Sequence, residues 1–147
     1  MSQNAVRRFI LDPAEQDPEA VALIDASTGA ETTRGQLAEG VLKAAGALAG
    51  LGIRSEQRVM MVMADRPSFV EVFWGAISHG AVPVPVSTML PTKDYRFLLE
   101  DSRAVACVVS DLFADQVLPA TSDQPFLEHV IGEGPNSVGL VLPYEAL

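Results

Sequence analysis

The chain has 147 residues, of which 48% are hydrophobic and 20% charged, so the composition excludes a disordered chain and suits one domain or subdomain. The formal net charge is −9, and the ten lysines and arginines form no cluster, which argues against a nucleic-acid-binding surface. The stretch Val72–Thr92 carries no Asp, Glu, Lys or Arg, but glycines and prolines interrupt it, so we predict no membrane span.

The first residues predict a short helix over Ala5–Leu11, followed by the loop DPAEQDPE. The apolar run after the two N-terminal arginines is too short for a secretory signal. Val21–Asp25 (VALID) predicts a strand, and Ser27–Ala30 predicts a turn that returns the chain.

The clearest helix begins at Thr33, because Thr33 and Gln36 fit a capping box. Gly52 supplies the left-handed position that ends the helix, and Ile53 can contact Leu48 across a Schellman turn. Apolar residues recur at steps of three and four and predict one buried stripe: Leu37, Val41, Ala44, Leu48 and Leu51.

Arg58–Ala64 (RVMMVMA) predicts a strand that is buried on both faces. Its methionines could suggest a soft metal site, but adjacent strand residues face opposite ways, so we predict that they fill the core. The next helix starts at Pro67 and ends at His79–Gly80. For His79, a cap or a packed ring is the better interpretation than catalysis.

Val82–Val86 alternates valine with Pro83 and Pro85, which remove two amide donors from the same side of a strand. We therefore predict a strand that pairs along one side only. Ser87 and Thr88 would lie at its carboxyl end, where open α/β sheets bind ligands. The alternative is that the prolines only protect a sheet edge from aggregation.

The remaining elements are an amphipathic helix over Thr92–Ser102, a buried strand over Ala104–Val109, a helix over Leu112–Leu118 capped by Asp111, and a strand over Phe126–Ile131. The strand Ala104–Val109 contains Cys107, the single cysteine, which excludes an internal disulfide. We expect an inert buried thiol there and a reducing, cytoplasmic location for the protein.

The alternation of strands and helices predicts an α/β fold with a mostly parallel sheet flanked by helices. The strands assigned to this sheet are VALID, RVMMVMA, VPVPV and VACVV. Residues 1–147 would form a single α/β subdomain, with a less regular stretch over 119–147.

No catalytic constellation emerges from the residues themselves. The sequence has no glycine-rich phosphate loop, and its two histidines, His79 and His129, lack metal-ligand spacing. We therefore predict no catalytic, cofactor-binding or metal-binding residue in this chain.

The segment Thr32–Asp111 resembles the N-terminal part of the adenylate-forming acyl- and aryl-CoA ligases, particularly benzoate-CoA ligase. The resemblance rests most on GAVPVPV at Gly80–Val86, followed by Tyr95, Leu98 and the run DSRA at Asp101–Ala104. It implies the N-terminal subdomain of the adenylate-forming (AMP-binding) ligase fold.

Members of that family join a carboxylate to ATP and then transfer the acyl group to coenzyme A, with magnesium as cofactor. The resemblance implies that the phosphate loop, the magnesium-placing acidic residue and the catalytic lysine lie outside these 147 residues, which end at YEAL. Some relatives place an arginine for the CoA nucleotide after the proline strand, and Met89 stands at that position here.

Two hypotheses follow. The first is an N-terminal segment of a CoA ligase that is inactive alone, with the rest of the ligase as its partner or with self-association through exposed apolar surface. The second is a stand-alone, non-catalytic relative that acts as a binding or assembly module. The sequence does not identify the carboxylic acid, because the acyl pocket is expected from downstream segments.

Overall fold

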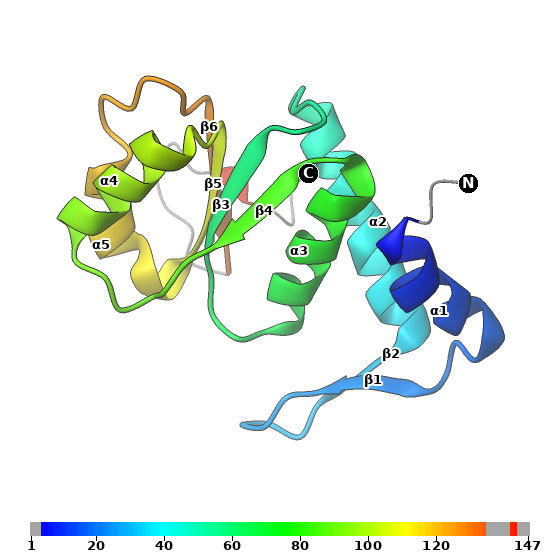
Figure 1. Cartoon of the computed structure of the whole chain (residues 1–147). Helices are drawn as coiled ribbons and strands as arrows, with labels where there is room; N and C mark the ends of the chain where they lie inside the picture. Colours follow the sequence, from blue (N-terminus) through cyan, green and yellow to red (C-terminus); the bar gives the residue numbers. More distant parts are fainter. Residues whose placement is uncertain (1–3, 135–141, 144–147) are drawn as a thin grey trace.

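The computed structural model describes residues 4–134 and the backbone of Leu142–Pro143. Its centre is a parallel sheet with strand order β4-β3-β5-β6-β7 (Figure 1). The five strands of this described sheet are β3 Arg58–Val62, β4 Val82–Pro85, β5 Ala106–Ser110, β6 His129–Glu133 and β7 Leu142–Pro143. The predicted α/β class with a mostly parallel sheet is confirmed.

Helices cover both faces of the sheet. Figure 1 shows α2 and α3 on one face and α4 and α5 on the other. Their bounds are α2 Arg34–Gly50, α3 Pro67–His79, α4 Thr92–Ser102 and α5 Ala114–Val117. Alternate residues of β3 point to opposite faces, so Met61 packs under α2 and α3 while Met60 packs under α4. Met63, which directly follows the strand, packs in the same cluster as Met61. The methionines fill the core, as predicted.

Local sequence signals define α2 at both ends. The Thr33 side chain accepts a hydrogen bond from the Gln36 amide, and the Gln36 side chain accepts one from the Thr33 amide, which confirms the capping box. At the other end, the Ile53 amide donates to the Leu48 carbonyl at 3.2 Å and Gly52 has φ 78°, as in a Schellman turn.

Strand β4 lies at the edge of the sheet and pairs with β3 alone among the described strands. The Val82 and Val86 amides donate to carbonyls on the β3 side, at 2.8 and 3.0 Å. Pro83 and Pro85 therefore occupy the positions whose amides would face away from β3. The predicted one-sided pairing of the proline strand is confirmed.

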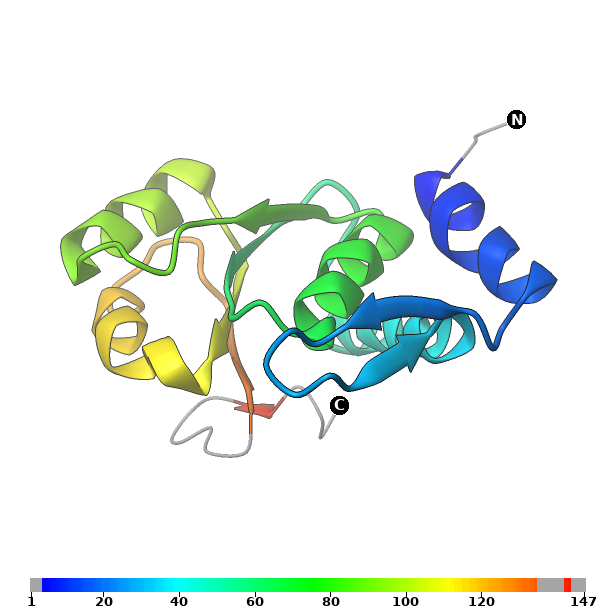
Figure 2. The same ribbon diagram turned by 90° about the horizontal axis from the view of Figure 1, so that it is seen from below.

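The strand β1 (Val21–Ile24) does not join the main sheet, so its assignment to that sheet was wrong. It pairs antiparallel with β2 (Glu31–Thr33) in a separate two-stranded sheet, which Figure 2 shows beside α2 and α3. The partner strand is close in sequence and reached through a short turn, whereas β3 already has β4 and β5 on its two sides.

The N-terminal helix is longer than predicted, because it continues into the first part of the expected loop and ends at Gln16. A π-helical turn, η1 (Arg7–Leu11), leads into α1 (Asp12–Gln16), where the Asp12 amide donates to the Arg7 carbonyl. The wider turn accommodates Pro13, which has no amide to continue the usual ladder. A buried stripe at steps of four anchors the helix against α2: Val6, Ile10 and Ala14.

The segment after β5 is also less regular than the single helix predicted from Asp111. It consists of η2 (Asp111–Phe113), the one-turn α5 and η3 (Leu118–Ala120). Pro119 cannot donate to a continuing helical ladder. The Asp111 side chain accepts from the adjacent Leu112 amide and does not cap a helix.

The strand predicted over Phe126–Ile131 begins three residues later, at His129. The Glu128 and His129 amides both donate to the Val105 carbonyl, and the ladder with β5 starts from there. Phe126 lies outside the strand, where the Arg103 guanidinium covers its ring at 5.4 Å from the centroid.

Candidate functional site

The carboxyl ends of β3, β4, β5 and β6 meet at one edge of the sheet, because these strands are parallel. Open α/β sheets bind their ligands at this edge. Two groups of residues occupy it: a polar network after β3, β5 and β6, and the loop over residues 86–91 after β4.

The polar network is centred on the Glu133 carboxylate, at the end of β6. The Ser110 hydroxyl at the end of β5 donates to Glu133 Oε2 at 2.5 Å, and the Ser68 hydroxyl of α3 donates to Oε1 at 2.8 Å. The Ser110 oxygen in turn accepts from the Ala64 amide at 2.9 Å. Ser110 is fully buried and Glu133 is 7% exposed, so these bonds replace water around a buried carboxylate.

Arg66 completes the network from the loop between β3 and α3. Its Nη1 lies 3.5 Å from Glu133 Oε1 and 3.6 Å from Asp111 Oδ1, so two carboxylates share this guanidinium. Gly134 follows Glu133 with φ 113°, and a Cβ there would lie 2.7 Å from Asp111 Oδ1. Glycine thus allows the chain to pass the Asp111 carboxylate closely.

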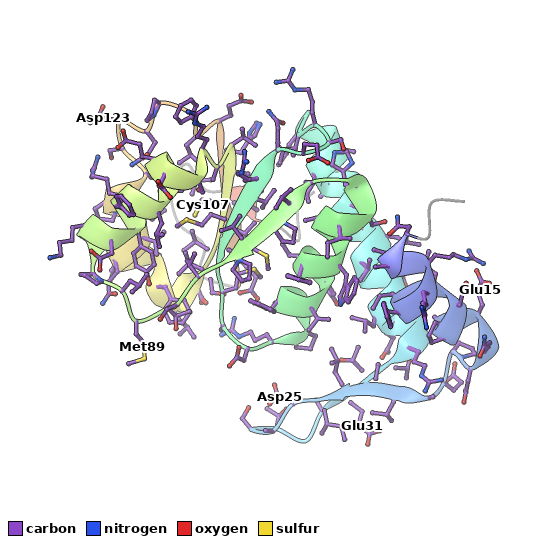
Figure 3. All side chains as sticks on the ribbon, viewed as in Figure 1. Glu15, Asp25, Glu31, Met89, Cys107 and Asp123 are labelled. Atoms are coloured by element: carbon purple, nitrogen blue, oxygen red, sulfur yellow. The ribbon has the colours of Figure 1, made fainter. Side chains whose placement is uncertain are left out.

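The second group is the loop after the proline strand, which contains Ser87 and Thr88 at the carboxyl end of β4. The Tyr95 hydroxyl donates to the Ser87 carbonyl at 3.0 Å and accepts from the Leu90 amide at 3.3 Å. Because Tyr95 is fully buried, it fixes the loop to α4. Met89 points away from the body and is 89% exposed (Figure 3).

An open hollow of about 1000 Å³ adjoins the network and lies between α2 and α3. Its wall contains Glu133, Glu71 and the Glu39–Lys43 ion pair, whose atoms lie 2.8 Å apart. Burial raises the pKa of Glu71; Lys43 opposes this shift and the charge of Glu133 adds to it. Four glutamates and one lysine line the hollow, so carboxyl groups outnumber ammonium groups there.

The two histidines and the cysteine considered in the sequence lie away from the carboxyl-edge network or within the core. His79 Nε2 lies within hydrogen-bond distance of the Ile53 carbonyl, which fits the predicted packed ring at the end of α3. Cys107 is fully buried in β5, and burial raises the pKa of its thiol to about 12 (Figure 3). His129 lies in β6.

The carboxyl-edge network was missed in the sequence, although a signal for it was present. A polar residue follows each buried strand: Arg66 after β3, Ser110 and Asp111 at the end of β5, and Glu133 at the end of β6. The order of the parallel strands brings these three strand ends together. The sequence alone did not show which strands are neighbours, so the meeting of these residues was not predicted.

The protein is an open, parallel α/β domain, and a polar network of Arg66, Ser110 and Glu133 lies at the carboxyl edge of its sheet. Residues 11–143 match the family described as AMP-binding enzyme. The chain belongs to this family, as the resemblance implied.

Two relatives illustrate the match. The 4-hydroxybenzoate–CoA/benzoate–CoA ligase of Rhodopseudomonas palustris is 39% identical over 100 residues, which are 68% of this chain and 19% of that protein. An uncharacterized protein of Mycobacterium tuberculosis is 30% identical over 118 residues, which are 80% of this chain and 66% of that protein. The chain thus spans about a fifth of the ligase and two thirds of the shorter relative.

The fold is similar to that of solved acyl-CoA ligases. The anthranilate CoA ligase AuaEII, crystallised with anthranoyl-AMP, superimposes with a TM-score of 0.87 at 27% identity, over 97% of this chain and 27% of that chain. The chain therefore has the fold of an N-terminal part of such a ligase, as predicted.

The family implies ATP, magnesium and coenzyme A for a full-length member. Nowhere in residues 4–134 do three or more His, Cys, Asp or Glu residues meet as metal ligands. Arg66, the cation of the carboxyl-edge network, is engaged by Asp111 and Glu133. We derive no catalytic step through ATP, magnesium or coenzyme A.

Among the described residues, every helix is too short or too polar to span a lipid bilayer.

Proposed function

We propose that this chain is the N-terminal segment of an ATP-dependent acyl- or aryl-CoA ligase. In the full-length enzyme, a carboxylate and ATP would give an acyl-adenylate, and coenzyme A would then give the thioester. The observation that carries the proposal is the family match over residues 11–143, together with the 39% identity to a ligase of which the chain covers 19%.

The 147 residues would not catalyse adenylation alone, and we assign no catalytic, cofactor-binding or metal-binding residue to them. Adenylation needs hydrogen-bond donors and a metal ion positioned around the triphosphate. Support comes from the engaged Arg66 and from the net charge of −9, which repels a polyanion.

The proposal extends to organisation and location. Residues 1–147 would form one N-terminal α/β subdomain of the AMP-binding domain, with 119–147 less regular, in a cytoplasmic enzyme. Its partner would be the remainder of the ligase, which would cover exposed apolar side chains such as Ile24 and Leu112; without it, these side chains would favour self-association. We propose no nucleic-acid partner.

The second candidate is a stand-alone, non-catalytic relative that acts as a binding or assembly module. The short Mycobacterium tuberculosis relative favours it, because the chain covers 66% of that protein and only 19% of the benzoate-CoA ligase.

Reading the gene beyond Leu147 decides between the candidates. A phosphate-loop motif within the next ~30 codons, a spacing taken from the family resemblance, supports the ligase segment, and a stop codon supports the module. Biochemically, pyrophosphate release is measured with ATP, magnesium and a panel of aryl and fatty acids. We expect pyrophosphate release from the extended protein and none above background from residues 1–147. Turnover by the 147 residues alone would contradict the proposal that this segment is inactive without the rest of the ligase.

A further inference from the structure

Glu133 connects segments that are far apart in the sequence. Its carboxylate binds Ser110 at the end of β5, Ser68 at the start of α3 and Arg66 in the loop after β3. We propose that Glu133 is a positioning residue, which fixes the loops after β3 and β5 against the end of β6 so that the carboxyl edge is preformed.

The direction of the hydrogen bonds requires a carboxylate. The Ser110 oxygen accepts from the Ala64 amide, so its single proton is left to donate to Glu133. Glutamine at position 133 has the same shape, but one of the two acceptor oxygens becomes an NH2 group. If this NH2 faces Ser110, the Ser110 proton loses its acceptor in a fully buried place. If the amide is turned over, the NH2 faces the Arg66 guanidinium, which is also a donor.

Charge adds to this requirement. Arg66 is 35% exposed, and it lies between the Asp111 and Glu133 carboxylates, which have 10% and 8% exposed side chains. Removing the Glu133 charge leaves Arg66 with Asp111 alone, and the loop that carries Arg66 loses its link to β6. The loop after β3 therefore depends on Glu133 through two routes, Ser110 and Arg66.

If the proposed function is correct, an ordered carboxyl edge would favour docking of the rest of the ligase. If the remainder of a ligase docks on the carboxyl edge, loops that are already ordered reduce the entropy lost on docking. The positioning role itself concerns only contacts within this chain, so it can be tested whether or not the chain is part of a ligase.

The test is hydrogen exchange of single backbone amides in the 147-residue chain, followed by NMR. In Ser110→Ala and Glu133→Gln, exchange of the Ala64 amide should accelerate by about tenfold or more, because its acceptor is lost or disordered. The amide of Met60, buried in β3, should keep its rate. Ser110→Thr retains the hydroxyl and should retain slow exchange at Ala64. Glu128→Gln removes a charge from an exposed side chain just before β6 and should change neither rate.

Two results would overturn the positioning role. One is an unchanged Ala64 rate in Glu133→Gln. The other is an equal acceleration at Ala64 and Met60, which would mean that the substitution only lowers global stability. Neither result bears on the ligase proposal, which the gene sequence beyond Leu147 and the pyrophosphate measurement test separately.

Discussion

Gly75 of α3 lies against Ala44 of α2 with no room for a side chain: a Cβ at Gly75 would be 2.5 Å from the Ala44 Cβ and 3.1 Å from the Val41 carbonyl oxygen. The two helices therefore touch through their backbones at this point. We expect Gly75→Ala to lower the free energy of unfolding by about 1–3 kcal/mol, because the helices must separate to admit the methyl group. Urea unfolding followed by circular dichroism measures the change.

Gly46→Ala is the matched control for this substitution. Gly46 lies in α2, and a Cβ there meets no atom within 4 Å. Alanine should stabilise this helix position by about 0.5–1 kcal/mol through its helix propensity. If both substitutions stabilise the protein, the close contact at Gly75 is not present in solution.

The prolines of β4 give a second prediction. Replacing Pro83 and Pro85 by valine restores two amide donors on the open side of an edge strand, which other strands can then bind. We expect the double variant to self-associate at lower concentration than the original chain, as measured by sedimentation velocity. The control is Pro125→Ala in an exposed loop, which should leave the association unchanged. Equal association of all three proteins would count against a protective role of the prolines.

Local signals predicted local structure well. The capping box at Thr33 and the Schellman turn at Gly52 involve residues within six positions of one another, so the sequence contains all the partners. The edge position of β4 was likewise predictable, because proline restricts pairing wherever the strand lies.

Pairing between distant segments was not predictable in the same way. The residues Val21–Ile24 are typical of a strand, but they do not indicate its partner. The strand pairs with Glu31–Thr33 and not with β3. Arg66, Ser110 and Glu133 are each ordinary polar residues after a strand, and their meeting depends on the strand order. The hollow beside Glu71 depends on how α2 and α3 pack, which hydrophobic periodicity does not specify.

Cys107 supports a prediction about reactivity. Burial raises the pKa of its thiol to about 12, so the nucleophilic thiolate is nearly absent at pH 8 and the reagent has no access. We expect no reaction of the folded chain with a disulfide reagent on the minute timescale, and reaction in urea that follows unfolding. Ser122→Cys adds an exposed thiol and should react with one equivalent at once. Fast reaction of Cys107 in the folded protein would show that β5 opens locally.

Glu71 gives the last prediction, which concerns pH. Burial raises the pKa of its carboxyl, the Glu133 charge adds to the shift and Lys43 opposes it. The folded state thus holds the Glu71 proton more tightly than the unfolded chain does. Its contribution to stability is fully present below the unfolded pKa and is lost as pH rises through the raised folded value. Glu71→Gln removes this titration, so its free energy of unfolding relative to the original chain should increase between pH 3.5 and pH 7 in urea titrations. The exposed Glu128→Gln should show no such trend, and a Glu71→Gln difference that is the same at both pH values would mean that the carboxyl is not desolvated.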